Sequence, residues 1–179
     1  MASYVTGLDG NSQEEGTCAM GKSVRLQAGE GDSVSLRGTR VTFRVKSGEA
    51  EGASCTEWIA APGFDTGLHV HERLEETWYV LDGELEFRLA DEVLAAASGA
   101  CVFVPPHVPH AFANRGHAPA KFLLLMSPPT HDRYFVELAE ILERSGPADS
   151  EAIAALRARY DTQQLSSLKT DAEPQPAAR

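Results

Sequence analysis

The sequence predicts an all-β domain of the sandwich or barrel type, followed by a short helical extension. Short apolar runs recur at even spacing through most of the chain, and turns that contain Gly and Pro divide them. Several of these runs alternate apolar with polar side chains, which is the period of a half-buried strand. After Pro128 and Pro129 the apolar spacing becomes that of a helix. These observations place the strands first and the helices last.

Alternation predicts the strands of the first half. The clearest case is the run of Val41, Phe43 and Val45, which alternates with polar residues. A later strand contains Trp58 and ends before the turn signal of a Pro-Gly pair. The strands predicted in this half are residues 24–27, 33–37, 40–46 and 54–60.

The strands of the second half surround a hairpin signal at Asp82 and Gly83, a pair that favours a tight turn. Beyond this turn, Leu85, Phe87 and Leu89 share one face of the returning strand, because strand side chains alternate between faces. The strands predicted in this half are residues 76–81, 84–90, 101–104, 110–113 and 120–126.

Two helices are predicted after the double proline. The first carries apolar residues at positions i, i+3, i+4 and i+7, namely Phe135, Leu138, Ala139 and Leu142. Gly146 and Pro147 end this helix, and Asp149 or Ser150 can cap the second one. The second helix gathers its apolar residues on one side, at Ile153, Leu156 and Tyr160. Both apolar faces are expected to pack on the β domain or on a second subunit.

One domain with an extension at each end is expected. The first residues are rich in Gly, Ser, Asn and Glu, and the last residues are polar, so neither end is predicted to order on its own. The strand edges of a small barrel predict a homodimer, in which the arm or the helices cover a neighbour's edges. The predicted division is a flexible arm over 1–20, a β-barrel domain over 21–128, helices over 129–165 and a disordered tail over 166–179.

Composition argues against several classes of protein. The formal net charge is −10, which disfavours a nucleic-acid surface, because phosphates are met by clustered Lys and Arg. No apolar run is long enough for a membrane helix and the start shows no signal pattern, so a cytoplasmic protein with a small-molecule substrate is expected. Cys18, Cys55 and Cys101 are odd in number and widely spaced, which favours free thiols over a disulfide framework.

Four residues in the middle of the chain form a candidate metal site. His69 and His71 are two residues apart, so on a strand both imidazoles leave the same face. Glu76 opens the next apolar run, and His110 lies near the end of the segment GACVFVPPHVPHAFAN. Three neutral imidazoles and one carboxylate suit a divalent transition metal and leave room for water or substrate. Iron, manganese, nickel, cobalt, copper and zinc all remain possible, because this donor set does not select among them.

These residues resemble the two signature motifs of the cupin superfamily. The first motif, G-x5-H-x-H-x(3,4)-E-x6-G, is matched by Gly63, His69, His71, Glu76 and Gly83. The second, G-x5-P-x-G-x2-H-x3-N, is matched by Gly99, Pro105, His110 and Asn114, with His107 where the family usually has Gly. The resemblance implies a cupin jelly-roll β-barrel over residues 33–127, with a metal held by the histidines and the glutamate of the two motifs.

Glu75 competes with Glu76 for the role of carboxylate ligand. Adjacent strand residues point to opposite faces, so only one of the two can face the histidines. The family spacing to Gly83 favours Glu76, because Glu75 would leave seven residues before that glycine rather than six. Glu75 is then a solvated charge. Glu76 could also be catalytic, if its carboxylate takes a proton from a bound hydroxyl group.

Aromatic residues near the motifs are candidate walls of a substrate pocket. Trp78 shares the strand parity of Glu76, and Phe112 shares that of His110, so both are expected to face inward. Trp58 is the third aromatic candidate, and all three can equally be plain core residues. His107 could orient substrate or exchange a proton, with an exposed loop position as the alternative.

The predicted activity is that of a metal-dependent cupin enzyme. Small cupins of this build resemble quercetinase-like dioxygenases, which implies an oxygenase that acts on a small oxygen-rich aromatic or polyketide-like metabolite. Polyketide cyclase-like cupins have similar size and motifs, so a redox-neutral isomerase, cyclase or lyase is the alternative. A cupin that binds a small molecule without turnover is the third possibility.

Overall fold

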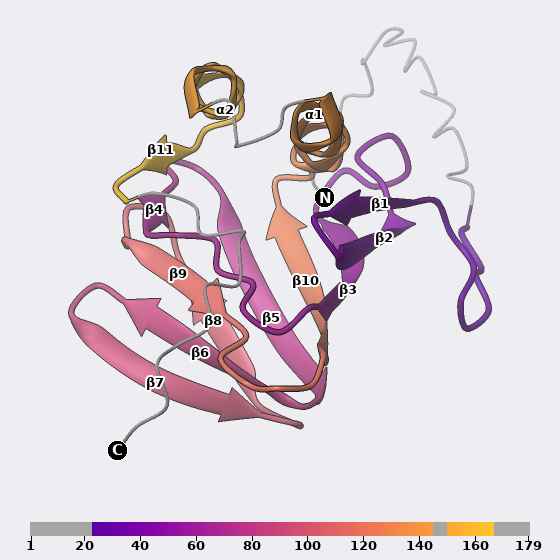
Figure 1. Cartoon of the computed structure of the whole chain (residues 1–179). Coiled ribbons are helices and arrows are strands. Elements are labelled where there is room, and N and C mark those ends of the chain that lie inside the picture. The colour runs from indigo at the N-terminus through magenta and orange to yellow at the C-terminus, as the bar shows by residue number, and fades with distance from the viewer. Residues whose placement is uncertain (1–22, 145–149, 167–179) are drawn as a thin grey trace, which may run out of the picture.

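Two antiparallel β-sheets packed face to face, with two helices over one end, form the part of the chain that the structure describes, residues 23–144 and 150–166 (Figure 1). In this computed structural model the six-stranded sheet has the order β1 (Ser33–Leu36), β2 (Thr39–Val45), β3 (Ser54–Ala60), β10 (Ala120–Ser127), β5 (Glu75–Asp82) and β8 (Cys101–Val104). The five-stranded sheet has the order β11 (Gln163–Gln164), β4 (His69–Val70), β9 (His110–Ala113), β6 (Glu84–Leu89) and β7 (Glu92–Ala97).

This arrangement is the predicted jelly roll, with one difference. The two sheets remain separate layers of a sandwich in the described residues and do not close into one continuous barrel. The strands predicted from alternation are present with small shifts at their ends, apart from residues 24–27, which are exposed and lie in no strand. Three strands lack a predicted counterpart: β4 and β11, which have two residues each, and the alanine-rich β7.

The core fills the space between the two inner faces. Along β5, Glu76, Trp78 and Val80 are buried, while Glu75 and Tyr79 on the other parity are exposed. This alternation is the period of a strand with one covered face. The buried carboxylate of β5 therefore belongs to the face that meets the other sheet.

Trp58 lies at the centre of an aromatic cluster. Its ring stacks on Phe122 at a centroid distance of 5.6 Å and meets the edge of Phe135 at 5.1 Å. Its indole N–H donates to the hydroxyl of Thr56 at 2.9 Å, so the polar edge of this buried ring has a partner. Aromatic pairs of this kind contribute about 0.5–1.5 kcal/mol each beyond the burial of area.

Two helices cover one end of the sandwich (Figure 1): α1 (Asp132–Arg144) and α2 (Ser150–Arg159). The apolar positions predicted for the first helix are all buried, at Phe135, Leu138, Ala139 and Leu142. In the second helix Ile153 and Leu156 are buried, and Tyr160 follows its last residue. The helices therefore close the end of the space between the sheets with apolar side chains.

Two motif positions require a left-handed backbone. Gly83 has φ of +77°, and a Cβ there would lie 3.1 Å from the Cα of Ala120, so a side chain would be both strained and crowded. His107 has φ of +67°, which explains why glycine suits this position of the motif. The amide of His107 donates to the carbonyl of His71 at 2.8 Å, so this strained turn is fixed against the first motif.

Some predictions concern parts of the chain outside the described residues. These are the N-terminal arm with Cys18, the capping position Asp149, and all but the first residue of the predicted tail. Within the described ranges, Cys55 is half-buried, Cys101 is exposed, and both are free thiols. No helix in those ranges is long and apolar enough to cross a membrane.

Candidate metal centre

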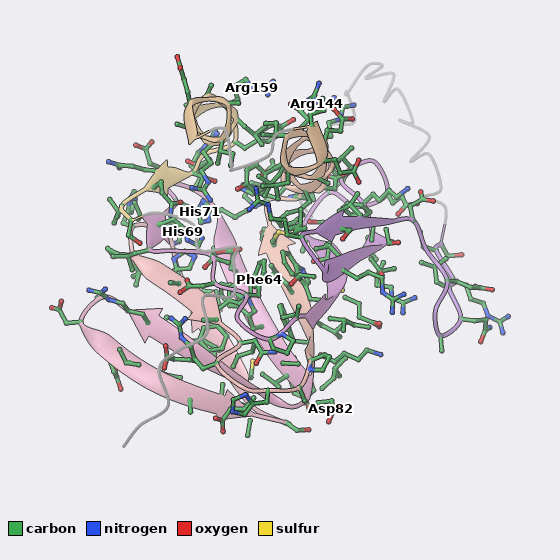
Figure 2. The ribbon with its side chains drawn as sticks, viewed as in Figure 1. Phe64, His69, His71, Asp82, Arg144 and Arg159 are labelled. Carbon is green, nitrogen blue, oxygen red and sulfur yellow. The ribbon has the colours of Figure 1, made fainter. Side chains whose placement is uncertain are left out.

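The candidate ligands come from both sheets and meet between them. His69 begins β4 and is the register partner of His110 on β9, while Glu76 approaches from β5 of the opposite sheet. His71 follows directly after β4 and points to the same side as His69, as its spacing predicts. Figure 2 shows both histidines toward the helical end of the sandwich, with Asp82 at the far end.

The four side chains are close enough to share one ion. One donor atom from each of His69, His71, Glu76 and His110 lies within 4.8 Å of all the others, and the four residues are buried. Oε2 of Glu76 lies 2.7 Å from Nε2 of His110 and 3.4 Å from Nε2 of His71. The rings of His69 and His110 have centroids 4.3 Å apart. Three imidazoles and a carboxylate around one point are a donor set that suits a divalent transition metal.

Backbone carbonyls fix the orientation of each imidazole. Nδ1 of His69 lies 2.9 Å from the carbonyl oxygen of Gly67, and Nδ1 of His110 lies 2.9 Å from that of Val108. Nδ1 of His71 lies 2.6 Å from the carbonyl oxygen of Asp161. A carbonyl oxygen can only accept, so each Nδ1 carries a proton and Nε2 faces the centre of the cluster. This is the arrangement of metal-ligating histidines, and the residues present therefore fit a metal.

The protonation states also suit a metal. Burial, with a smaller effect of the neighbouring His110, lowers the pKa of His69 to about 3, so this ring is neutral at neutral pH. Burial by itself would raise the pKa of Glu76, but hydrogen bonds from His110 and His71 outweigh it and hold that pKa well below its ordinary value. A neutral imidazole and an ionised carboxylate are the forms that bind a metal.

The C-terminal extension supports the cluster from outside. The carboxylate of Asp161 accepts hydrogen bonds from the backbone amides of Glu72, Arg73 and Leu74, at 3.2, 2.9 and 3.2 Å. These amides belong to the loop between His71 and β5, so one side chain fixes the loop that carries two of the candidate ligands. Since its carbonyl also holds His71, Asp161 supports the site through both its side chain and its backbone.

A second contact to His71 comes through a pair of buried polar side chains. The hydroxyl of Thr162 lies 3.4 Å from Nδ1 of His71 and 3.3 Å from Nε2 of His131. His131 is 3% exposed, and burial, followed by the charge of His71, lowers its pKa to about 4. His131 is therefore a neutral ring that packs edge-on against a candidate ligand.

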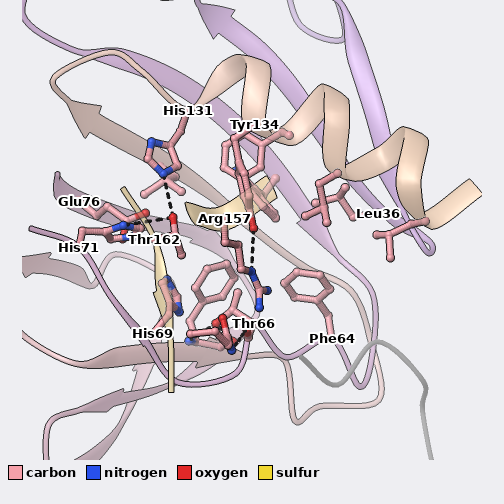
Figure 3. Close-up of a pocket in the computed structure, with 17 residues that line it drawn as sticks. Leu36, Phe64, Thr66, His69, His71, Glu76, His131, Tyr134, Arg157 and Thr162 are labelled. Atoms are coloured by element: carbon pink, nitrogen blue, oxygen red, sulfur yellow. Dashed lines mark hydrogen bonds and ion pairs between the residues drawn. The ribbon is translucent and has the colours of Figure 1, made fainter. Parts of the chain in front are cut away.

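A cavity of about 60 Å³ opens beside the cluster and extends toward the helices (Figure 3). His69, His71 and Glu76 lie at one side of it. Most of the remaining lining is apolar and comes from both sheets and α1: Leu36, Trp58, Phe64, Phe112, Leu124, Phe135, Leu138 and Leu142. The polar remainder is Thr66, His131, Tyr134, Arg157, Thr162 and Gln164. A site of this kind can hold one small molecule against the candidate metal.

The predicted pocket residues divide into two groups. Trp58 and Phe112 line the cavity. Trp78 is not part of its lining and packs beside His110, at a centroid distance of 5.8 Å. His107 is exposed and also lies outside the lining.

The site also contains residues that the sequence analysis did not single out. Asp161, Thr162, Arg157 and His131 all belong to the helical extension, and the nearest motif histidine is about 60 to 90 residues away along the chain. No motif links these residues to the β domain. The one available signal was chemical: Arg157 falls between the apolar positions of a short helix, where a charged side chain is rarely buried.

Comparison with known proteins agrees with the fold and the motifs. A family profile described as a cupin domain matches residues 56–126, the span from β3 to β10. The uncharacterized protein MJ1618 of Methanocaldococcus jannaschii is 37% identical over 90 residues, which cover 50% of this chain and 69% of that protein.

Solved structures give the same architecture. KdgF from a Halomonas species is similar with a TM-score of 0.55 at 20% identity, over 64% of this chain and 98% of that one. An RmlC-like cupin from Shewanella frigidimarina gives a TM-score of 0.54 at 19% identity, over 64% and 99% of the two chains. With the jelly roll, the two motifs and the identity to the archaeal protein, the chain belongs to the cupin superfamily.

Proposed function

We propose that this protein is a metal-dependent enzyme that oxygenates a small oxygen-rich metabolite. The observation that carries the proposal is the buried cluster of three histidines and Glu76, which faces a mostly apolar cavity. Cupins are often enzymes, and a complete donor set beside an enclosed cavity favours catalysis over simple binding. A bound transition metal would supply an open coordination position for substrate oxygen and the capacity for redox chemistry.

The cavity limits the size of the substrate. One water molecule requires about 10–15 Å³ of such volume, so about 60 Å³ corresponds to roughly four to six water-sized groups. Trp58, Phe64 and Phe112 form rigid walls around this space, because each is itself packed against another ring. The proposed substrate is therefore small, at most a single ring with its oxygen substituents.

Glu76 is the proposed base. Its carboxylate is ionised and faces the cavity, so it can accept a proton from a substrate hydroxyl beside it. His110 and His71 stabilise the carboxylate before substrate arrives. The apolar walls limit the access of water to this proton transfer. Removal of a proton without oxidation would give an isomerase, cyclase or lyase, which is the alternative that the same residues support.

Oxygen uptake separates these two reactions. Metal-free protein would be loaded with each of Fe(II), Mn(II), Co(II), Ni(II), Cu(II) and Zn(II), then mixed with small phenols, enediols and 2-oxo acids in an oxygen electrode. The proposal expects uptake with a redox-active metal, and none with zinc. His117→Ala removes an exposed histidine and is the matched control for His110→Ala, which should lose both metal and uptake. Proton exchange from D₂O into a substrate without oxygen uptake would contradict the oxygenase and support the alternative.

Glu76→Gln tests the role of the base. The amide still offers an oxygen to the metal, but it carries no charge and cannot accept a proton. If Glu76 only holds the metal, excess metal should restore activity fully. The base role predicts a rate about a hundredfold lower or more even at saturating metal. Full activity of Glu76→Gln at saturating metal would remove this role.

A further inference from the structure

Arg157 places a buried positive charge in the cavity. This residue lies in the last turn of α2, is 5% exposed and lines the cavity together with the candidate ligands. In Figure 3 its guanidinium points into the cavity, with His69 on one side and Phe64 on the other. A guanidinium does not lose its proton in a protein, so the charge is permanent.

The guanidinium has unused hydrogen-bond donors. Its Nε donates to the hydroxyl of Tyr134 at 3.3 Å, and this is its one hydrogen bond within the described residues. Its two terminal nitrogens, which carry four N–H groups, have no carboxylate within ion-pair distance there. By contrast, Arg44 pairs with Glu57 at 2.8 Å. A buried charge costs free energy unless it is paired, so these donors indicate a partner that is not part of the described protein.

Glu76 does not serve as that partner. It is the other charged carboxylate or guanidinium in the lining, but its carboxylate contacts His110 and His71, and no ion pair with Arg157 forms. A divalent metal on the cluster would more than cancel the charge of Glu76. The loaded cavity would then carry a net positive charge, which favours a negatively charged ligand.

We propose that the cavity binds a small carboxylate, with its two oxygens on the terminal nitrogens of Arg157. The planar fork of a guanidinium matches a carboxylate with two parallel hydrogen bonds, and the small volume favours this group over bulkier anions. The rest of the ligand extends toward the cluster, where the proposed reaction takes place, and this second step rests on the proposed function. Arg157 thereby defines the substrate class as a small oxygen-rich carboxylic acid.

Calorimetric titration of the metal-free and Zn(II)-loaded protein tests the proposal without turnover. The probes are formate, acetate and pyruvate, with formamide, acetamide and pyruvamide as neutral counterparts and inorganic phosphate as a second anion. At least one carboxylate should bind about tenfold tighter than its amide, and Arg157→Met should weaken that binding by about ten- to a hundredfold. Arg157→Lys should recover part of the affinity, because it keeps the charge without the fork.

Arg159→Met is the matched control. Arg159 belongs to the same helix but is exposed and pairs with Glu137, so its loss should leave carboxylate binding unchanged. Thermal unfolding without ligand adds a second readout. If Arg157 awaits an anion, Arg157→Met should raise the midpoint temperature, because it removes an unpaired buried charge. A purely structural tether between α2 and Tyr134 would instead make the variant less stable.

Several results would overturn this inference. These are equal binding of carboxylates and amides, unchanged carboxylate binding by Arg157→Met, tighter binding of phosphate, or no carboxylate binding at any concentration tested. None of them depends on catalysis. A protein that binds carboxylates through Arg157 but turns over nothing with any metal would refute the proposed function and leave this inference standing.

Discussion

Replacement of Asp161 should weaken metal binding although its carboxylate is not among the candidate ligands. The carboxylate holds three backbone amides of the loop that joins His71 to β5, with donor–acceptor distances of 2.9 to 3.2 Å. Without it, the loop gains freedom, and both His71 and Glu76 lose their fixed positions. Loss of an outer support of this kind typically lowers metal affinity by about ten- to a hundredfold.

The structure also gives the expected loss of stability. Hydrogen bonds to a charged group contribute about 1.5–3 kcal/mol when buried, but two of these three are exposed, so about 1 kcal/mol each is appropriate. Asp161 has φ of +54°, and alanine there adds about 1 kcal/mol of backbone strain. Asp161→Ala should therefore lose about 3–4 kcal/mol. Asp161→Asn should lose less, because asparagine tolerates this conformation.

Urea unfolding of the metal-free protein measures the stability, and competition with a chelating dye measures metal affinity. Asp91→Ala, in the exposed turn between β6 and β7, is the control and should change neither quantity. Burial by itself would raise the pKa of Asp161, but the three amides outweigh it and lower that pKa. Its contribution is therefore present above about pH 4 and is lost as the pH falls through the lowered pKa. Unchanged metal affinity in both variants would refute the assigned supporting role.

Two further predictions concern pH and assembly. Because the pKa of His131 is lowered to about 4, the unfolded chain binds its proton first as the pH falls, and the metal-free protein should lose up to about 3 kcal/mol between pH 6.5 and 4. Urea unfolding of His131→Gln should show a smaller loss over that range, and an equal loss would contradict the assignment. We also propose a homodimer through the outer face of the six-stranded sheet, where Tyr79, Phe103 and Leu125 are exposed on neighbouring strands. Light scattering should report a dimer for the wild type and a monomer for Phe103→Glu, and a monomeric wild type would count against it.

The parts that the sequence could predict are those with a local period. Alternation along β5 places Glu76 inward and Glu75 outward, and the two-residue spacing places His69 and His71 on one side. The four candidate ligands therefore converge as the motifs suggest. The β7 strand was missed because its alanines carry little strand signal, and it is defined instead by its pairing with β6.

The remaining features depend on contacts between distant segments. Strand parity shows that Trp78 faces inward, but it does not show at which part of the inner face the cavity lies. That is decided by where α1 and α2 dock. The same docking brings Asp161 against His71 and turns Arg157 into the cavity, and no local pattern encodes either contact.

Metal analysis of the purified protein is the most direct test of the central claim, that His69, His71, Glu76 and His110 form one metal site. Wild-type protein dialysed against a divalent transition metal should retain about one ion per chain, and His69→Ala and His110→Ala should retain far less. The exposed-histidine variant His117→Ala should match the wild type. A wild type that retains no metal, or histidine variants that retain as much as the wild type, would contradict the account.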